Sequence, residues 1–373
     1  HQPLFGLARI SSLTTPSPAL MAALALGSLL LAWLTWRWVE QPFRRRSGGR
    51  VSGRAVVFAS CLAAAALAGV GIHGQATEGR RQTWMAANPE KAPVYDLHRA
   101  AMRIEGVYLD DGACRFNVPR TDARTVARLL DCRERHGPGV AIFGDSHASD
   151  FFNGVNAAYD GDFVFGMTLG GCWMRTDPGT TCDFNAFASL LREHPGLFRL
   201  VLYHQAGYRY LETADGETGP QILGRIPENA PVPVEDFRVL DARIDEGLAF
   251  LEELARSAPL VWVGPRIEPR IRLNYVLRGG CRHDYALRSG QSGLFRALDR
   301  HLAGAAADAG IAYVSLIEAL RLEMPADFMT CDDLYWRDGD HWSAAGAKRF
   351  VRRFLERTPI EALAGLRGGT RLR

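Results

Sequence analysis

The stretch GVAIFGDSH, residues 139–147, joins an uninterrupted apolar run to a polar turn. A short apolar run of this kind is typical of a strand buried on both faces of a sheet. Gly144 permits a tight turn, and the helix expected to start there offers free backbone N–H groups to a developing negative charge. The turn therefore presents the Ser146 hydroxyl at the end of a strand. Such a serine is either a helix cap or a nucleophile, and a nucleophile needs a base with an orienting group.

From residue 139 onward, apolar strands alternate with amphipathic helices. Leu240, Ile244 and Leu248, for example, recur at helical spacing before the next apolar run. This alternation predicts an α/β fold in which a parallel sheet is covered by helices on both faces, with its site at the carboxyl ends of the strands. Ser146 falls at such an end. The expected strands are Val140–Phe143, Phe163–Gly166, Phe198–Tyr203, Pro259–Val263 and Ile311–Leu316.

A second polar motif, DGDHWS at residues 338–343, precedes the last amphipathic helix. The Asp338 carboxylate can accept a hydrogen bond from the His341 ring and fix its tautomer, so that the other ring nitrogen takes the serine proton. Asp340 competes for this role, but as the chain neighbour of His341 it is expected to be poorly placed to reach the ring. Each motif alone is weak, because serine caps and Asp-x-x-His pairs are common. Together they predict a Ser146–His341–Asp338 triad.

Positive charge is concentrated in the first 72 residues, which contain seven arginines, no lysine and one acidic residue, Glu40. The whole chain has 44 basic and 41 acidic residues, so the remainder is slightly acidic. It carries no nucleic-acid signature, and we expect no nucleic-acid partner.

Two uncharged stretches, residues 19–36 and 55–72, have the length of short membrane spans. We expect two transmembrane helices, at about residues 19–38 and 55–72, in a bacterial inner membrane. The second stretch could instead be a buried core helix or an uncleaved signal segment. The positive-inside rule makes the loop between the spans cytoplasmic and places everything after Ile72 outside the cytoplasm, which in a bacterium is the periplasm. The arginines of that loop are Arg44, Arg45, Arg46, Arg50 and Arg54.

The pattern divides the chain into three segments. Residues 1–72 are expected to be the end of a membrane domain, residues 73–138 a periplasmic linker with a short extension, and residues 139–373 the α/β domain. The chain begins without an initiator Met, and we expect it to be the C-terminal piece of a longer polytopic protein.

The chain has seven cysteines, of which only Cys61 lies in an expected span. An even number in an exported domain indicates disulfides. Zinc is the alternative, but no CxxC pair is present and the spacings are irregular, so we expect no metal. Pairing of nearest neighbours is the simplest prediction: Cys114–Cys132, Cys172–Cys182 and Cys281–Cys331.

The Gly-Asp-Ser turn and the late Asp-x-x-His pair together resemble the SGNH hydrolase family over residues of about 139–357. The resemblance implies that Ser146 is the nucleophile, His341 the base and Asp338 the orienting acid. It also implies an oxyanion hole made by a glycine N–H after the second strand and an asparagine after the third. Gly171, or Gly170, fits the first of these, beside the N–H of Ser146 itself.

The expected asparagine is missing. After the third strand the sequence reads HQAG, residues 204–207. Gln205 has the same amide donor on a longer stem and is predicted to serve in the oxyanion hole, with His204 as a second candidate. The alternative is a strand end whose polar groups only contact the backbone. One such donor contributes about 3 kcal/mol of transition-state stabilisation, so the substitution affects rate and not reaction type.

The membrane segment resembles the end of an acyltransferase-3 domain. This resemblance rests on WRWVEQPFRR, residues 36–45, and on the opening HQPLF. Some members of that family carry an additional span and a C-terminal periplasmic SGNH domain. They are similar in function to O-acetyltransferases that modify polysaccharides such as O-antigen, with acetyl-CoA as the ultimate donor. The histidine and arginine that are typical of the membrane domain would lie in earlier helices, so residues 1–72 inherit neither role.

The resemblances predict that Ser146 carries an acyl group, most simply acetyl, and passes it to a sugar hydroxyl. The expected partners are a surface polysaccharide, the lipid bilayer and an N-terminal membrane acyltransferase domain; no cofactor is expected to bind this portion. Two alternatives stay open, a carbohydrate esterase of the same fold and a non-catalytic glycan-binding domain. Some aromatic residues near the motifs could stack on sugar or belong to the core: Trp173, Tyr208, Tyr210 and Trp342.

Overall fold

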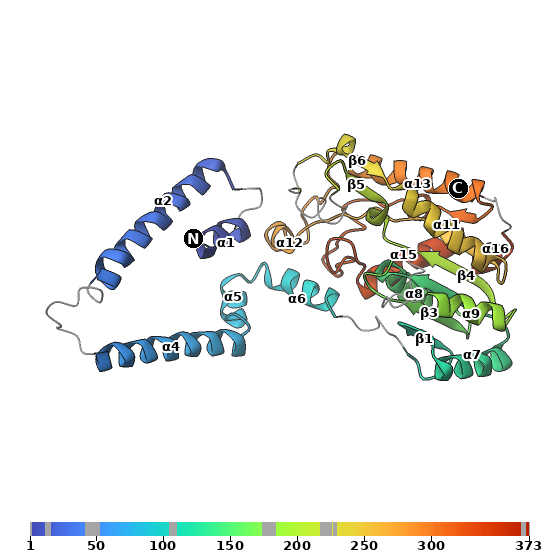
Figure 1. Cartoon of the computed structure of the whole chain (residues 1–373), viewed down its shortest axis with the longest axis horizontal. Helices are drawn as coiled ribbons and strands as arrows, with labels where there is room; N and C mark the ends of the chain where they lie inside the picture. Colours follow the sequence, from blue (N-terminus) through green and yellow to red (C-terminus); the bar gives the residue numbers. More distant parts are fainter. Residues whose placement is uncertain are drawn as a thin grey trace. The chain divides into compact units, whose positions relative to one another are not determined.

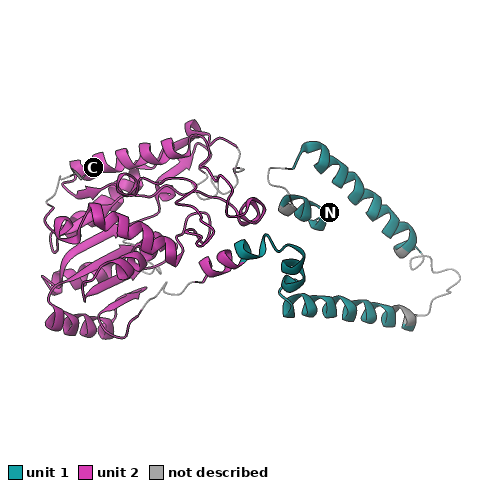
Figure 2. Cartoon of the chain, turned by 180° about the vertical axis from the view of Figure 1, so that it is seen from behind, with its two compact units in different colours: residues 1–95 teal, residues 96–373 magenta. Residues whose placement is uncertain are grey.

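The computed structural model of the 373-residue chain describes residues 2–11, 16–41, 53–103, 110–173, 184–216, 226, 230–366 and 371–372. These residues form two compact units, residues 1–95 and residues 96–373 (Figure 2). The division falls inside a single short helix, α6 (Ala92–Ala101).

The first unit contains two long apolar helices, α2 (Pro18–Thr35) and α4 (Gly53–Ala76). By length and composition alone, Pro18–Trp38 and Val57–Ala76 could cross a membrane, and neither span is buried within the structure. Both expected apolar helices are thus confirmed. Arg44, Arg45, Arg46 and Arg50, which decide the expected orientation, lie outside the described residues. The remaining elements are α1 (Gln2–Ser11), the π-helix η1 (Trp36–Glu40) and α5 (Arg81–Ala87).

The second unit (Figure 1) is built on a seven-stranded sheet. The strand order is β1-β3-β2-β4-β7-β8-β9, and every described pairing in this sheet is parallel. The α/β prediction is therefore confirmed. The two central neighbours of β2 share its register, since Phe143 lies opposite both Met167 of β3 and Tyr203 of β4. The strands are β1 (Arg115–Val118), β2 (Gly139–Gly144), β3 (Val164–Thr168), β4 (Phe198–His204), β7 (Leu260–Val263), β8 (Ala312–Val314) and β9 (Arg371–Leu372).

Both faces of this sheet are apolar because consecutive side chains of each buried strand point to opposite sides. One face, which includes Ala141 and Phe143, joins a single core cluster with α7 (Ala123–His136), α9 (Asn185–Glu193), α11 (Asp241–Ala255) and α13 (Gln291–Asp308). The helices α8 (Ser146–Ala158) and α15 (Ala344–Arg357) pack against each other, as in the contact of Phe151 with Phe354.

Shorter elements complete the unit. A separate antiparallel pair joins β5 (Leu211–Thr213) to β6 (Phe237–Val239). The short helices are α12 (Leu273–Gly279), α14 (Leu316–Leu320), α16 (Ile360–Ala364) and the 3-10 turns η2 (Gly207–Tyr210) and η3 (Val234–Asp236).

The sheet begins earlier in the chain than residue 139, where the sequence places the domain boundary. β1 is an edge strand that pairs with β3, with Phe116 opposite Phe165. Phe116 is buried in the core, and Cys114 just before it is bonded to Cys132 of α7. Residues 115–136 are therefore part of the α/β unit and not of a separate extension. The strand is hard to predict because it has only four residues, in polar surroundings.

Two of the three predicted disulfides are confirmed, Cys114–Cys132 and Cys281–Cys331. Cys172 is also disulfide-bonded, and its predicted partner Cys182 lies outside the described residues. Cys61 is a free cysteine.

Two glycines allow close approach, one in the turn after β2 and one within α8. Gly144 has φ +142°, and a Cβ there would lie 2.0 Å from the His204 carbonyl oxygen. Gly154 lets α8 contact α15, because its Cβ would lie 2.2 Å from Val351 Cγ2 and 2.5 Å from the Ala347 carbonyl oxygen. Any side chain at Gly154 therefore forces the two helices apart.

We predict that Gly154→Ala lowers the free energy of unfolding by about 1–3 kcal/mol, the usual range for overpacking a buried contact. Gly304→Ala in α13 is the matched control, since a Cβ there meets nothing within 4 Å. That change should leave stability unchanged or raise it by up to about 1 kcal/mol through helix propensity. Denaturant unfolding of both variants tests the prediction, and equal stabilities would contradict it.

Candidate active site

Asp145 and Gly144 shape the turn that carries Ser146. Asp145 is the N-cap of α8, and its Oδ1 accepts a hydrogen bond of 2.9 Å from the His147 backbone N–H. Its Oδ2 accepts bonds from Arg209 Nε at 3.0 Å and from the Ala206 N–H at 3.2 Å. Burial raises the pKa of Asp145, although Arg209 and these donors oppose the rise. The motif aspartate therefore anchors the turn to the end of β4, and Ser146 begins the helix.

The structure brings the three predicted triad residues together. His341 Nε2 lies 2.8 Å from Ser146 Oγ, and His341 Nδ1 lies 3.0 Å from both carboxylate oxygens of Asp338. These distances are those of hydrogen bonds. They join Ser146, near the start of the α/β unit, to His341, which lies 195 positions later in the chain. The arrangement matches the order nucleophile, base and orienting acid.

Asp338 also organises the loop around the histidine. Its Oδ1 accepts hydrogen bonds from the backbone N–H of Asp340 at 3.0 Å and of His341 at 2.8 Å. The Asp338 side chain is 43% exposed, whereas the His341 side chain is 18% exposed.

The expectation that Asp340 cannot reach the ring is wrong. Its Oδ1 lies 3.3 Å from His341 Nδ1, and its Oδ2 lies 3.5 Å from His147 Nε2. Asp338 closes a turn by accepting the backbone N–H groups of Asp340 and His341, and this turn brings the Asp340 side chain close to the imidazole. The spacing of the residues in the sequence does not reveal this contact. Burial would raise the pKa of Asp340, but the nearby rings of His147 and His341 and the charge of Arg270 outweigh burial and lower it. Asp340 is therefore ionised.

The carboxylates strongly favour the protonated form of the base. Burial lowers the pKa of His341, but the bonds to Asp338 and Asp340 and the charge of Asp150 outweigh it, and the pKa rises to about 10. The resulting imidazolium is the species that forms when a histidine takes a proton from a serine. The site thus stabilises the charge that develops on the base.

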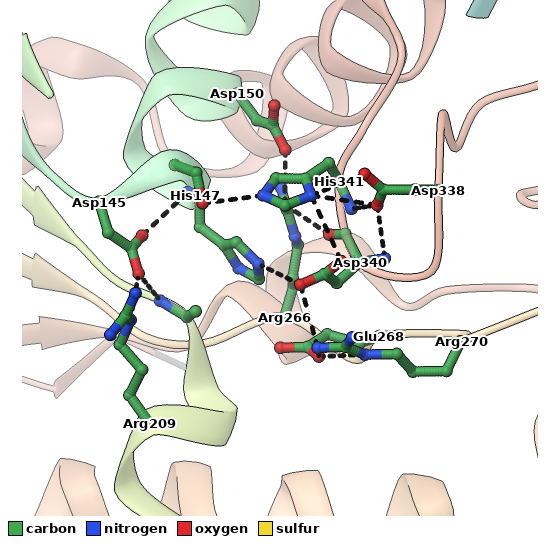
Figure 3. A network of polar contacts seen from close by, with 12 residues as sticks. Asp145, His147, Asp150, Arg209, Arg266, Glu268, Arg270, Asp338, Asp340 and His341 are labelled. Carbon is green, nitrogen blue, oxygen red and sulfur yellow. Dashed lines mark hydrogen bonds and ion pairs between the residues drawn. The ribbon is translucent and has the colours of Figure 1, made fainter. Parts of the chain in front are cut away.

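A network of buried charges holds the loop and α8 together (Figure 3). Asp150 Oδ2 accepts bonds from Arg266 at 2.6 Å and from the Trp342 N–H at 2.8 Å. The same Arg266 nitrogen donates to the Asp340 carbonyl oxygen at 2.7 Å, and its guanidinium lies 4.1 Å from the Trp342 ring centroid. Arg266 and Asp150 are both buried.

A second ion pair lies beneath Asp340. Arg270 donates to Asp340 Oδ2 at 3.0 Å and, through two nitrogens, to Glu268 Oε2 at 3.0 and 2.8 Å. Burial raises the pKa of Glu268 to about 7, against the lowering effect of Arg270. Figure 3 shows the end of the Arg270 side chain beside Glu268, with dashed lines that mark its contacts to Glu268 and Asp340.

The predicted glycine donor lies beside the nucleophile. A Cβ on Gly170 would lie 3.8 Å from Ser146 Cβ, so the loop after β3 runs next to the serine. Gly171 has φ +79°, which favours glycine there. Among the described residues, none accepts a hydrogen bond from the backbone N–H of Gly171 or Ser146. Both groups therefore remain candidate donors to an oxyanion.

Gln205 connects the end of β4 to the loop of Gly171, and its predicted part in the oxyanion hole stays a prediction, since an amide NH2 has two donors and the contact with that loop uses one. Its Nε2 donates to the Cys172 carbonyl at 3.1 Å, and its Oε1 accepts a hydrogen bond from the Tyr203 hydroxyl. Gln205 is buried, and its hydrogen bond to the Cys172 carbonyl holds the loop that contains Gly171. His204, the second candidate, uses Nδ1 to contact the Val263 carbonyl at 3.1 Å, and burial lowers its pKa to about 3.

The four aromatic residues near the motifs divide into two groups. Tyr208, Tyr210 and Trp342 are buried and belong to the core. Trp173 is half-buried and its Nε1 donates to Glu246 at 3.2 Å. Of these four side chains, Trp173 alone is partly exposed, and its ring contacts Arg243 and Tyr210.

One group of ligand-type side chains lies within the described part of the chain. His147, Asp340 and His341 place one ligand atom each within 4.8 Å of one another. Asp340 already pairs with Arg270 and His341 with Asp338, whereas neither buried ring nitrogen of His147 makes a hydrogen bond to a described residue. The expectation of no metal stays a prediction.

Several residues of the network are not evident from the sequence. Asp150 lies one helical turn after Ser146, which is a usable signal. Nothing in the local pattern singles out the other four, because the contacts that connect them to the site are with distant residues, namely Asp145, Asp150 and Asp340. These four are Arg209, Arg266, Glu268 and Arg270.

Comparisons with known proteins identify the family. A family model described as the SGNH domain, fused to AT3 domains, matches residues 107–356. Solved structures with similar folds include a candidate SGNH hydrolase from Slackia heliotrinireducens, with 17% identity, a TM-score of 0.38 and coverage of 59% of this chain and 97% of that one. A candidate platelet activating factor from Streptococcus pneumonia has 12% identity, a TM-score of 0.34 and coverage of 63% and 98%. No curated protein matches the sequence. The match over residues 107–356, more than half of the chain, shows that this protein belongs to the family of SGNH domains that are fused to acyltransferase-3 (AT3) domains.

Proposed function

We propose that this chain transfers an acyl group, most simply acetyl, to a hydroxyl of a bacterial cell-surface polysaccharide such as O-antigen. The observation that carries the proposal is the 2.8 Å contact of His341 Nε2 with Ser146 Oγ, in a family fused to AT3 domains. The fusion implies a membrane acyltransferase partner domain, which together with the two apolar helices indicates membrane association. In the proposal, the SGNH domain is periplasmic on the bacterial inner membrane, and acetyl-CoA is the ultimate donor.

Acylation begins at Ser146. Its Oγ forms a bond to the acyl carbon while its proton passes to His341 Nε2. The tetrahedral oxyanion is stabilised by the backbone N–H groups of Ser146 and Gly171. The donor's leaving group then departs with the proton from His341, and an ester of Ser146 remains. Asp338 holds the His341 ring with Nε2 facing the serine throughout.

The second half repeats the chemistry with the acceptor. His341 takes the proton of a sugar hydroxyl, the sugar oxygen bonds to the acyl carbon, and Ser146 leaves with the proton returned. Water in place of the sugar gives hydrolysis through the same ester. The half-buried Trp173 offers a surface on which a sugar ring can stack, which favours a glycan acceptor.

We expect Ser146→Ala, in the full-length protein, to lower surface polysaccharide acetylation by at least about a thousandfold, because no ester can form. Acetyl content of the purified polysaccharide is the measurement. Ser257→Ala, before β7 at the opposite end of the strands, is the control and should retain parental acetylation. Parental acetylation in the Ser146→Ala variant would exclude the catalytic function and leave a glycan-binding domain.

The choice between transfer and hydrolysis is tested with the full chain in detergent. The protein is supplied with an activated acetyl ester and increasing concentrations of a surface glycan. We expect acetylated glycan to increase and free acetate to fall, since the two acceptors compete for one ester. Release of acetate alone at every glycan concentration would assign the protein as a carbohydrate esterase.

The raised pKa of His341 predicts an alkaline pH dependence. Only the neutral imidazole can take a proton, so kcat/KM for an acetyl ester should still rise at pH 8 and level off only as pH approaches about 10. Asp338→Asn removes one carboxylate that raises this pKa. Its profile should shift to lower pH, with a lower plateau because the ring is less well oriented. An unshifted profile would contradict the assignment of Asp338.

A further inference from the structure

We propose that Asp340 is a second orienting carboxylate for His341, so that two acids and not one position the base. The inference rests on the catalytic use of His341 proposed above. It adds a positioning residue that the spacing of the Asp-x-x-His motif does not suggest.

The first argument is the geometry around Nδ1. The nitrogen lies 3.0 Å from each oxygen of Asp338 and 3.3 Å from Asp340 Oδ1. A single N–H therefore faces two carboxylates, and either can accept its hydrogen bond with a small rotation of the ring. Loss of one acid leaves the other within reach.

The second argument is that Asp340 is more firmly fixed than Asp338. The Asp340 side chain is 10% exposed, against 43% for Asp338. Arg270 holds Asp340 Oδ2 at 3.0 Å, and the fully buried Glu268 holds Arg270. The backbone N–H of Arg270 also donates to the Gly339 carbonyl at 2.7 Å. The Asp340 carboxylate is thus held in place by Arg270, whereas the Asp338 carboxylate is partly exposed to water.

The third argument is electrostatic. A carboxylate away from water acts on a neighbouring imidazole through a lower effective dielectric constant than an exposed one. Asp340 therefore affects the protonation of His341 despite its longer contact. The charged and titratable groups on the elements around this ring are Asp338, Asp340 and Arg337 on its own loop, His147 and Asp150 on α8, and Arg266, Glu268 and Arg270 after β7.

The test follows labelling of Ser146 by a fluorophosphonate, which needs no knowledge of the natural substrate. Labelling forms a bond from Ser146 Oγ to phosphorus and breaks the P–F bond; fluoride leaves, and the serine proton passes to His341. The second-order rate constant is measured against pH for the full chain in detergent. The variants are Asp338→Asn, Asp340→Asn, the double variant and Asp332→Asn, an exposed aspartate of the same loop region, as control.

We expect Asp340→Asn to slow labelling about tenfold and to shift the alkaline rise to lower pH. Asp338→Asn should lose about 10- to 100-fold, less than the roughly 10⁴-fold known for removal of a sole orienting aspartate. The double variant should lose more than the product of the two single losses, because each acid substitutes for the other. Asp332→Asn should keep the parental rate and profile.

The inference is overturned if Asp340→Asn leaves the labelling rate and its pH profile unchanged, both in the parent protein and in the Asp338→Asn variant. A variant that lowers the melting temperature without shifting the profile would also overturn it, since that is a structural role alone. If Asp340→Asn does not fold, Asp340→Glu keeps the charge beside Arg270 but displaces the carboxylate from Nδ1; slower labelling supports the inference and a parental rate overturns it. A parent whose Ser146 is not labelled at any pH refutes the proposed function itself.

Discussion

The geometry of the site depends on the buried ion pair between Asp150 and Arg266. Asp150 belongs to the helix that begins at Ser146, and it also accepts the backbone N–H of Trp342, the residue after His341. Arg266 continues the connection by donating to the Asp340 carbonyl oxygen. Two charges taken out of water need this kind of complete pairing, and removal of one partner typically costs about 3–5 kcal/mol. The pair therefore fixes the distance between nucleophile and base across the end of the sheet.

The surrounding charges form a stack of alternating sign. Glu268 lies under Arg270, Arg270 under Asp340, and Asp340 under the ring of His341. The charge of each buried group is neutralised by the next group in the stack. The imidazole of His341 is the last group and lies beside the negative Asp340, which favours the protonated form of the ring. The neutral His147 fits beside this stack, because burial holds its pKa well below the ordinary value. The site is thus prepared for the charge that appears when Ser146 loses its proton.

Prediction from sequence succeeded where local pattern and local chemistry coincide. Both apolar helices, the buried strands and the helix that contains Ile244 and Leu248 follow from periodicity, and Ser146, His341 and Asp338 follow from two short motifs. It failed for β1, whose four residues are stabilised by pairing with β3. The expectation that Asp340 is poorly placed to reach the His341 ring was also wrong, because the turn closed by Asp338 brings the Asp340 carboxylate to the ring.

The sequence by itself determined the order of strands and helices, the apolar spans and the three residue types of a serine nucleophile with its base and acid. Those features depend on neighbours in the chain, where periodicity and motif spacing carry the information. Only the tertiary structure decided that β1 completes the sheet edge and that Asp340 shares the base with Asp338. It alone also showed that Arg266, Arg270 and Glu268 hold the loop. These contacts join residues from distant parts of the chain, and their energies exist only when folding removes the charges from water.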